Sequence, residues 1–145
     1  MTRDIDIVIE LQEKDITNAV NLFKDNFYID RDSVTQAVHN RGIFNIIHNE
    51  FIIKVDFIIR KSDEYRQIEF QRRLQINIDS IPIWIVSLED LIISKLWWAK
   101  ESQSHIQISD VKNLLGATHT IDHTYINKWL EKMNLQDVYR KVINA

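Results

Sequence analysis

Apolar and acidic residues alternate near the start of the chain, where Ile5, Ile7 and Ile9 are interleaved with Asp4 and Asp6. A two-residue period is typical of a β-strand, and it places the isoleucines on one face and both aspartates on the other. Neighbouring carboxylates repel each other unless a cation, a shared proton or open water relieves the repulsion. The pattern therefore predicts a strand over residues 2–10 that either binds a divalent cation or presents an exposed polar face.

A second strand pattern, over residues 51–59, is apolar on both faces, which is typical of a strand in the middle of a sheet. Asp56 is the acidic residue within it, and an unpaired carboxylate would be costly in such a place. We therefore expect Asp56 to have a partner. Residues 44–48 form another β-rich run, and Asn49 and Glu50 predict a hairpin between the two.

Helical patterns dominate the second half of the chain. Ser87 and Asp90 form a capping-box pattern that opens a helix to about residue 100, apolar nearly all round. Lys95 lies on its apolar surface, so its ammonium group either reaches solvent or meets a carboxylate. Three further helices are predicted over residues 106–115, 125–133 and 135–143. Asp110 lies at the edge of the apolar face of the first of them.

Together these patterns predict an α/β protein of the α+β type, with a mixed β-sheet, covering helices and a C-terminal helical bundle. Residues 74–78 and 81–86 are predicted to form a further extended pair that can close one edge of the sheet. A length of 145 residues favours a single domain, with a sheet-containing core over 1–86 and a helical part over 87–145.

Basic residues are concentrated around the helix predicted over residues 62–74. Such a run is usually a solvated helix face. The alternative is a phosphate-facing patch near the end of the Asp56 strand, in which Arg60 and Arg73 are the candidate phosphate ligands.

The composition of the chain excludes several classes of site and partner. Hydrophobic residues are 45% and charged residues 27%, and the net charge of −3 disfavours a large nucleic-acid footprint but not a local basic patch. The absence of cysteine excludes disulfides, thiolate zinc sites and a cysteine nucleophile, and two glycines cannot build a glycine-rich phosphate loop. No run approaches the roughly 18 apolar residues of a membrane span, and no leader pattern precedes the first strand. We therefore expect a cytoplasmic protein that does not bind a membrane.

Three segments together resemble the nucleotidyltransferase superfamily, in particular small bacterial proteins similar to abortive-infection type II toxins. Residues 2–6, Thr-Arg-Asp-Ile-Asp, resemble the metal-binding strand of that family. Residues 54–57, Lys-Val-Asp-Phe, resemble the strand with its third carboxylate, and residues 87–96, Ser-Leu-Glu-Asp-Leu-Ile-Ile-Ser-Lys-Leu, resemble its next motif. The similarity extends over nearly the whole chain and implies a nucleotidyltransferase-like fold.

The resemblance also implies site residues and a reaction. Asp4, Asp6 and Asp56 would hold Mg²⁺ or Mn²⁺, and Asp56, Lys95 and Asp110 would be catalytic. The cation would neutralise an NTP and orient an attacking hydroxyl, and Lys95 would steady the phosphates. A nucleotidyl group would pass to an acceptor that the sequence leaves open between a tRNA, a protein and a small molecule.

Two departures from the family pattern leave a second function open. Family members place a helix and a phosphate-binding Gly-Ser turn before the Asp-x-Asp strand, and no such segment precedes Thr2, so we expect weaker phosphate binding. Residues 109–113 keep Asp110 but lack the arginine and second acid of the usual Arg-Asp-x-x-Asp. The second hypothesis is a catalytically reduced remnant that binds a partner chain, as an antitoxin or a regulator does. A homo-oligomer is compatible with either function.

Overall fold

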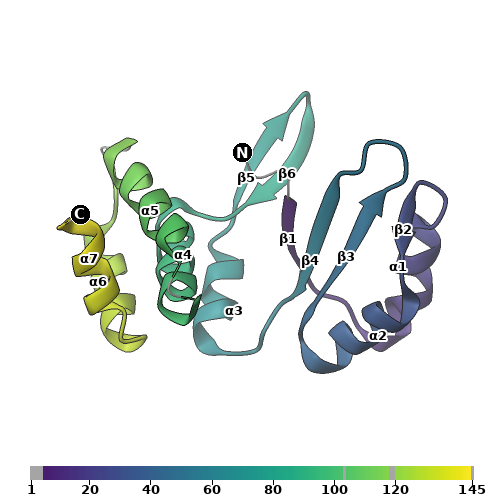
Figure 1. Ribbon diagram of the computed structural model, residues 1–145, viewed down its shortest axis with the longest axis horizontal. Coiled ribbons are helices and arrows are strands. Elements are labelled where there is room, and N and C mark those ends of the chain that lie inside the picture. The colour runs from purple at the N-terminus through teal and green to yellow at the C-terminus, as the bar shows by residue number, and fades with distance from the viewer. Residues whose placement is uncertain (1–4, 103, 118–119, 145) are drawn as a thin grey trace. The chain divides into compact units, whose positions relative to one another are not determined.

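The computed structural model describes residues 5–102, 104–117 and 120–144 of the chain (Figure 1). The contacts divide the chain into two compact units, Met1–Gln67 and Ile68–Ala145, called here the N-terminal and C-terminal units. The hairpin over residues 74–85 thus groups with the helices, whereas the sequence placed it in the sheet-containing part.

The N-terminal unit contains a four-stranded mixed sheet. Its strands are β1 (Ile5–Ile9), β2 (Phe27–Ile29), β3 (Ile43–His48) and β4 (Lys54–Ile59), in the order β1-β4-β3-β2. Strand β1 runs parallel to β4, and the other pairs are antiparallel. The mixed sheet and the central position of the Asp56 strand are therefore confirmed, as its two-sided apolar pattern predicted.

Two helices, α1 (Ile16–Phe23) and α2 (Arg31–Asn40), pack on one face of this sheet, and a short 3-10 turn, η1 (Glu13–Asp15), precedes them (Figure 1). Asp30 caps α2, because its carboxylate accepts the Ser33 amide proton at 2.9 Å. The buried core combines alternate residues of β3 and β4 with residues of both helices: Ile16, Val34, Ala37, Phe44, Ile46, Val55, Phe57 and Ile59. The odd-numbered residues of β4 therefore face the helices, and its even-numbered residues face the other way.

The connection between β3 and β4 is longer than the two residues that the sequence predicted. The His48 ring nitrogen Nδ1 accepts the amide protons of Glu50 and Phe51 at 3.1 and 3.2 Å. Ile52 then takes a positive φ of 53°, and its amide donates to the His48 carbonyl. These contacts fold residues 49–53 into a loop, so β4 begins at Lys54.

The C-terminal unit contains a β-hairpin and a helical bundle. Among the described residues, strands β5 (Leu74–Ile78) and β6 (Ile81–Ile85) pair only with each other, so the prediction that they close an edge of the main sheet is wrong. Asp79 and Ser80 both have positive φ, the signature of a tight two-residue turn that pairs the flanking strands with each other. The bundle comprises α4 (Leu88–Ser102), α5 (His105–Ala117), α6 (His123–Lys132) and α7 (Gln136–Ile143), and α3 (Glu64–Gln71) spans the boundary between the units.

The helix that the sequence predicted to be apolar nearly all round, α4, is buried in the bundle. Ile92, Ile93 and Leu96 of α4 are completely buried, as its nearly all-round apolar sequence predicted. Among the described residues, no helix combines the length and the apolar character that a bilayer crossing would require.

Candidate functional site

Asp6 and Asp56 lie next to each other across the parallel β1–β4 pair, since they are Cα partners in its register. Adjacent strands are about 4.8 Å apart, and side chains in register point to the same face. That face is the one turned away from α1 and α2, because the flanking Val55 and Phe57 belong to the core. The structure therefore brings together two of the three predicted metal-binding carboxylates, and Asp4 lies outside the described residues.

Asp56 has the partner that the sequence required. Lys54 lies two residues earlier on the same face, and its Nζ is 2.9 Å from Oδ2 of Asp56, whose side chain is 19% exposed. Asn45 is the Cα partner of Asp56 on β3 and adds an amide group to this face. One lysine against two carboxylates leaves the face with a net negative charge, and carboxylate and amide oxygens are suitable ligands for Mg²⁺ or Mn²⁺.

A third carboxylate ligand has to come from a residue other than Asp6 and Asp56. In the part of the chain that the structure describes, no three His, Asp or Glu side chains are grouped closely enough to hold a metal ion. Asp4 is not among the described residues, and in the sequence it comes two residues before Asp6, on the same face of the predicted strand. The sequence prediction of a three-carboxylate site therefore stands as a prediction.

Lys95 and Asp110 form an ion pair within the C-terminal unit. Nζ of Lys95 is 2.7 Å from Oδ2 of Asp110 and donates to the Gln107 side chain at 3.2 Å. The two partners are 24% and 42% exposed. Of the alternatives that the sequence left open for Lys95, the structure selects the carboxylate of Asp110. The pair lines a hollow of about 300 Å³, together with Asn113, Leu114 and Ala117.

Arg60 and Arg73, the predicted phosphate ligands, have partners of their own. Arg60 follows β4 and forms an ion pair with Glu10. Arg73 donates to the Phe70 carbonyl at 2.5 Å, and its guanidinium carbon lies 4.4 and 4.7 Å from the ring centroids of Phe70 and Trp84. A guanidinium group over an aromatic ring is attracted by the negative face of the ring. A role of Arg60 and Arg73 in phosphate binding remains a prediction.

Asp90 is the centre of a polar network that sequence reasoning missed. Asp90 is completely buried, and its Oδ2 accepts from Nε of Arg72 at 3.0 Å and from the Ser87 hydroxyl at 2.6 Å. Its Oδ1 accepts from the Tyr125 hydroxyl at 2.7 Å. The sequence assigned Asp90 to helix capping. The Asp90 amide does donate a hydrogen bond to Oγ of Ser87 at 3.2 Å. The signal that could have revealed the network is an acid in a largely apolar helix. A carboxylate buried there requires a positively charged side chain as its partner.

The network shifts the pKa values of Tyr125 and Arg72. Burial, followed by the hydrogen bond to Asp90, raises the pKa of Tyr125 above its ordinary value. Burial would by itself lower the pKa of Arg72, but the hydrogen bond and the charge of Asp90 raise it overall. Both effects keep Tyr125 protonated as a donor and Arg72 charged, which is the arrangement that a buried carboxylate needs.

No family model matches the chain. No curated protein sequence matches it either. Conclusions about function therefore rest on the residues and their geometry.

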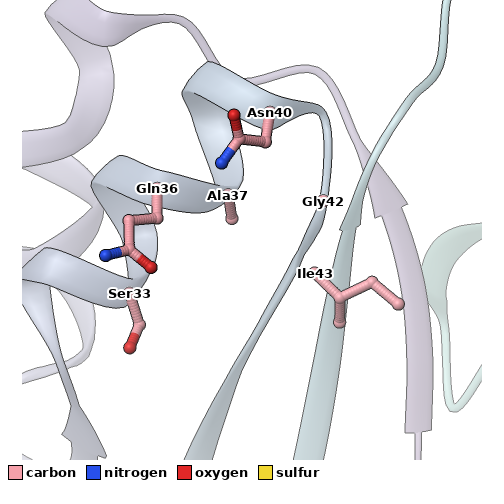
Figure 2. Close-up of a pocket in the computed structure, with 6 residues that line it drawn as sticks. All are labelled: Ser33, Gln36, Ala37, Asn40, Gly42 and Ile43. Atoms are coloured by element: carbon pink, nitrogen blue, oxygen red, sulfur yellow. The ribbon is translucent and has the colours of Figure 1, made fainter.

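A further hollow, of about 230 Å³, lies in the N-terminal unit between α2 and the start of β3 (Figure 2). The side chains of α2 that line it are Ser33, Gln36, Ala37 and Asn40, and Gly42 and Ile43 complete the lining. None of these residues carries a titratable side chain. The paired carboxylates on β1 and β4 are chemically better suited to bind a metal ion or to catalyse a reaction.

Proposed function

We propose that the chain is a metal-dependent nucleotidyltransferase-like protein whose metal site is built on β1 and β4. The observation that supports it best is the register that makes Asp6 and Asp56 neighbours on one face of the sheet. A structural strand pair gains nothing from like charges placed opposite each other, since such pairs are destabilising. A divalent cation shared by both carboxylates would relieve their repulsion.

Each residue of this face has a distinct role in the proposed reaction. Asp6 and Asp56 would hold the cation, with Asp4 as the predicted third carboxylate. Lys54 contacts Oδ2 of Asp56 and so orients that carboxylate, which can present its other oxygen to the cation. When bound, the cation would neutralise the phosphates of an NTP and favour in-line attack by an acceptor hydroxyl. A bond would form between the acceptor oxygen and the α-phosphorus as the bond from the α-phosphorus to the bridging oxygen breaks, so that pyrophosphate leaves and the hydroxyl proton passes to water.

The family resemblance implies that Lys95 of the C-terminal unit contacts phosphate, and its ion pair with Asp110 allows that role to be tested. We expect Lys95→Met to lower the affinity for a Mg²⁺–ATP complex about tenfold or more, because a positive charge is lost. Its cost in folding stability should be only about 1 kcal/mol or less, because both partners of the pair are partly exposed. Calorimetric titration and a denaturant melt of the same variant measure the two effects.

Lys100→Met is the matched control, since Lys100 lies on the same helix and donates to the Met133 carbonyl at 3.3 Å. It should leave nucleotide affinity unchanged. A Lys95→Met protein that loses about 3 kcal/mol or more of stability but binds nucleotide normally would identify a structural ion pair instead.

A further inference from the structure

The β5–β6 hairpin presents an entirely aliphatic face to solvent. The three cross-strand pairs on that face are Leu74 with Ile85, Ile76 with Ile83, and Ile78 with Ile81. Five of these six side chains are between 37% and 63% exposed, and Ile83 is half-buried. Within the described C-terminal unit, neither strand packs extensively on a helix. A lone two-stranded hairpin is marginally stable in water, so additional strands would stabilise it.

The turn determines which backbone groups of the hairpin point outward. Because a two-residue turn joins Ile78 to Ile81, that pair is hydrogen-bonded, and the next pair, Asn77 with Pro82, is not. The pair of Gln75 with Trp84 is likewise not hydrogen-bonded. The N–H and C=O groups of such residues point away from the hairpin.

The two edges differ in their ability to accept another strand. On the β6 edge one of the outward positions is Pro82, which has no N–H group and so blocks regular pairing. On the β5 edge Gln75 and Asn77 both present an N–H and a C=O group. Neither residue makes a backbone hydrogen bond to a described residue outside the hairpin. The β5 edge is therefore the one that can be extended.

The sequence of β5 is complementary to itself when it is reversed about Ile76. Antiparallel pairing of two β5 strands about a two-fold axis at Ile76 places Gln75 opposite Asn77 of the partner subunit. Both are outward-pointing residues, so each such pair makes two backbone hydrogen bonds, and symmetry doubles them to four. One step further out, just beyond β5, the register places Asp79 opposite the partner's Arg73, so residues of opposite charge meet at each end.

We propose that β5 is the dimerisation edge of this protein and that a second copy of the chain adds to it in this register. The product is a four-stranded antiparallel sheet in the order β6-β5-β5-β6, with isologous contacts about the two-fold axis. Its aliphatic face joins Leu74 to Ile78 of the partner subunit and Ile76 to the partner's Ile76. Two five-residue strands bury less than the roughly 1,200 Å² of a standard interface, so the dimer dissociates on dilution. Dimerisation through β5 does not depend on the metal-dependent function proposed above.

Sedimentation velocity from micromolar to millimolar protein tests the proposal. The wild type should shift from monomer to dimer, and Asn77→Pro should weaken the dimer at least about thirtyfold, because it removes two of the four backbone hydrogen bonds. Asn77→Ala, which keeps the N–H group, should weaken it far less. Circular dichroism would verify that each variant is folded. A wild type that stays monomeric throughout, or a dimer that Asn77→Pro leaves intact, would overturn the proposal.

The charge pairs provide an independent test of the register. Asp79→Asn and Arg73→Gln should each weaken the dimer a few-fold, and the double variant should be no weaker than the stronger of the two single effects. Asp79 is in the turn and Arg73 precedes the other end of β5, so coupling between them is expected only across the two-fold axis. Strictly additive effects would contradict the antiparallel register.

Discussion

Replacing Arg72 with methionine should destabilise the C-terminal unit by about 2–4 kcal/mol. Arg72 supplies the guanidinium group that contacts the completely buried carboxylate of Asp90. Removing one partner of a buried ion pair usually costs about 3–5 kcal/mol, because the remaining charge stays desolvated. We expect a somewhat smaller value because the Arg72 side chain is itself 36% exposed. Chemical denaturation followed by tryptophan fluorescence would measure the loss.

Arg140→Met is the control for this experiment. Arg140 pairs with Asp137 on the surface of α7, where both side chains are mostly exposed, so its loss should cost less than about 1 kcal/mol. Adding Asp90→Asn to Arg72→Met should recover part of the stability, because it removes the buried charge. Equal stability losses for Arg72→Met and Arg140→Met would show that the Asp90 network is not an important source of stability.

Manganese should stabilise the wild-type protein and fail to stabilise Asp56→Asn. A ligand that binds only the folded state adds RT ln(1 + [L]/Kd), about 2.7 kcal/mol at a hundredfold excess over Kd. Asp56 is the more buried acid of the pair and lies on the central strand, so its neutralisation removes a ligand held in a fixed place. Thermal melts with and without Mn²⁺ would show a raised melting temperature for the wild type.

Asp32→Asn is the control, because Asp32 is an exposed acid in the first turn of α2, a different element of the same unit. It should keep the full response to Mn²⁺. Identical manganese shifts in the wild type and Asp56→Asn would place the bound cation elsewhere.

The sequence predicted those features that depend on local periodicity. The apolar residues on both faces identified β4 as a central strand, and the isolated acid in it correctly required a partner, which is Lys54. The apolar pattern of α4 likewise predicted a buried helix, and its lysine was correctly limited to solvent or a carboxylate. In each case the deciding contact lies on the same strand or on a neighbouring helix.

Features that depend on distant partners were not accessible to the same reasoning. Arg72 and Tyr125 lie 18 and 35 residues from Asp90 along the chain, so no helical or strand period connects them. The sequence predicted the extended pair over residues 74–78 and 81–86, but not that this pair forms a sheet of its own. The outward apolar face of this hairpin resembled an inward-facing strand pair, because periodicity does not distinguish a buried face from an exposed one.

Transfer of a labelled nucleotide is the most direct test of the proposed function. Wild-type protein and Asp56→Asn would be incubated with each of the four NTPs labelled at the α-phosphate, with Mg²⁺ or Mn²⁺. The acceptors would be the chain itself, total tRNA and a protein extract. We expect metal-dependent labelling of one acceptor by the wild type, reduced about a hundredfold or more in Asp56→Asn, because the carboxylate holds the cation that stabilises the transition state. Equal labelling by both proteins, or no labelling of any acceptor by the wild type, would contradict a nucleotidyltransferase built on β1 and β4.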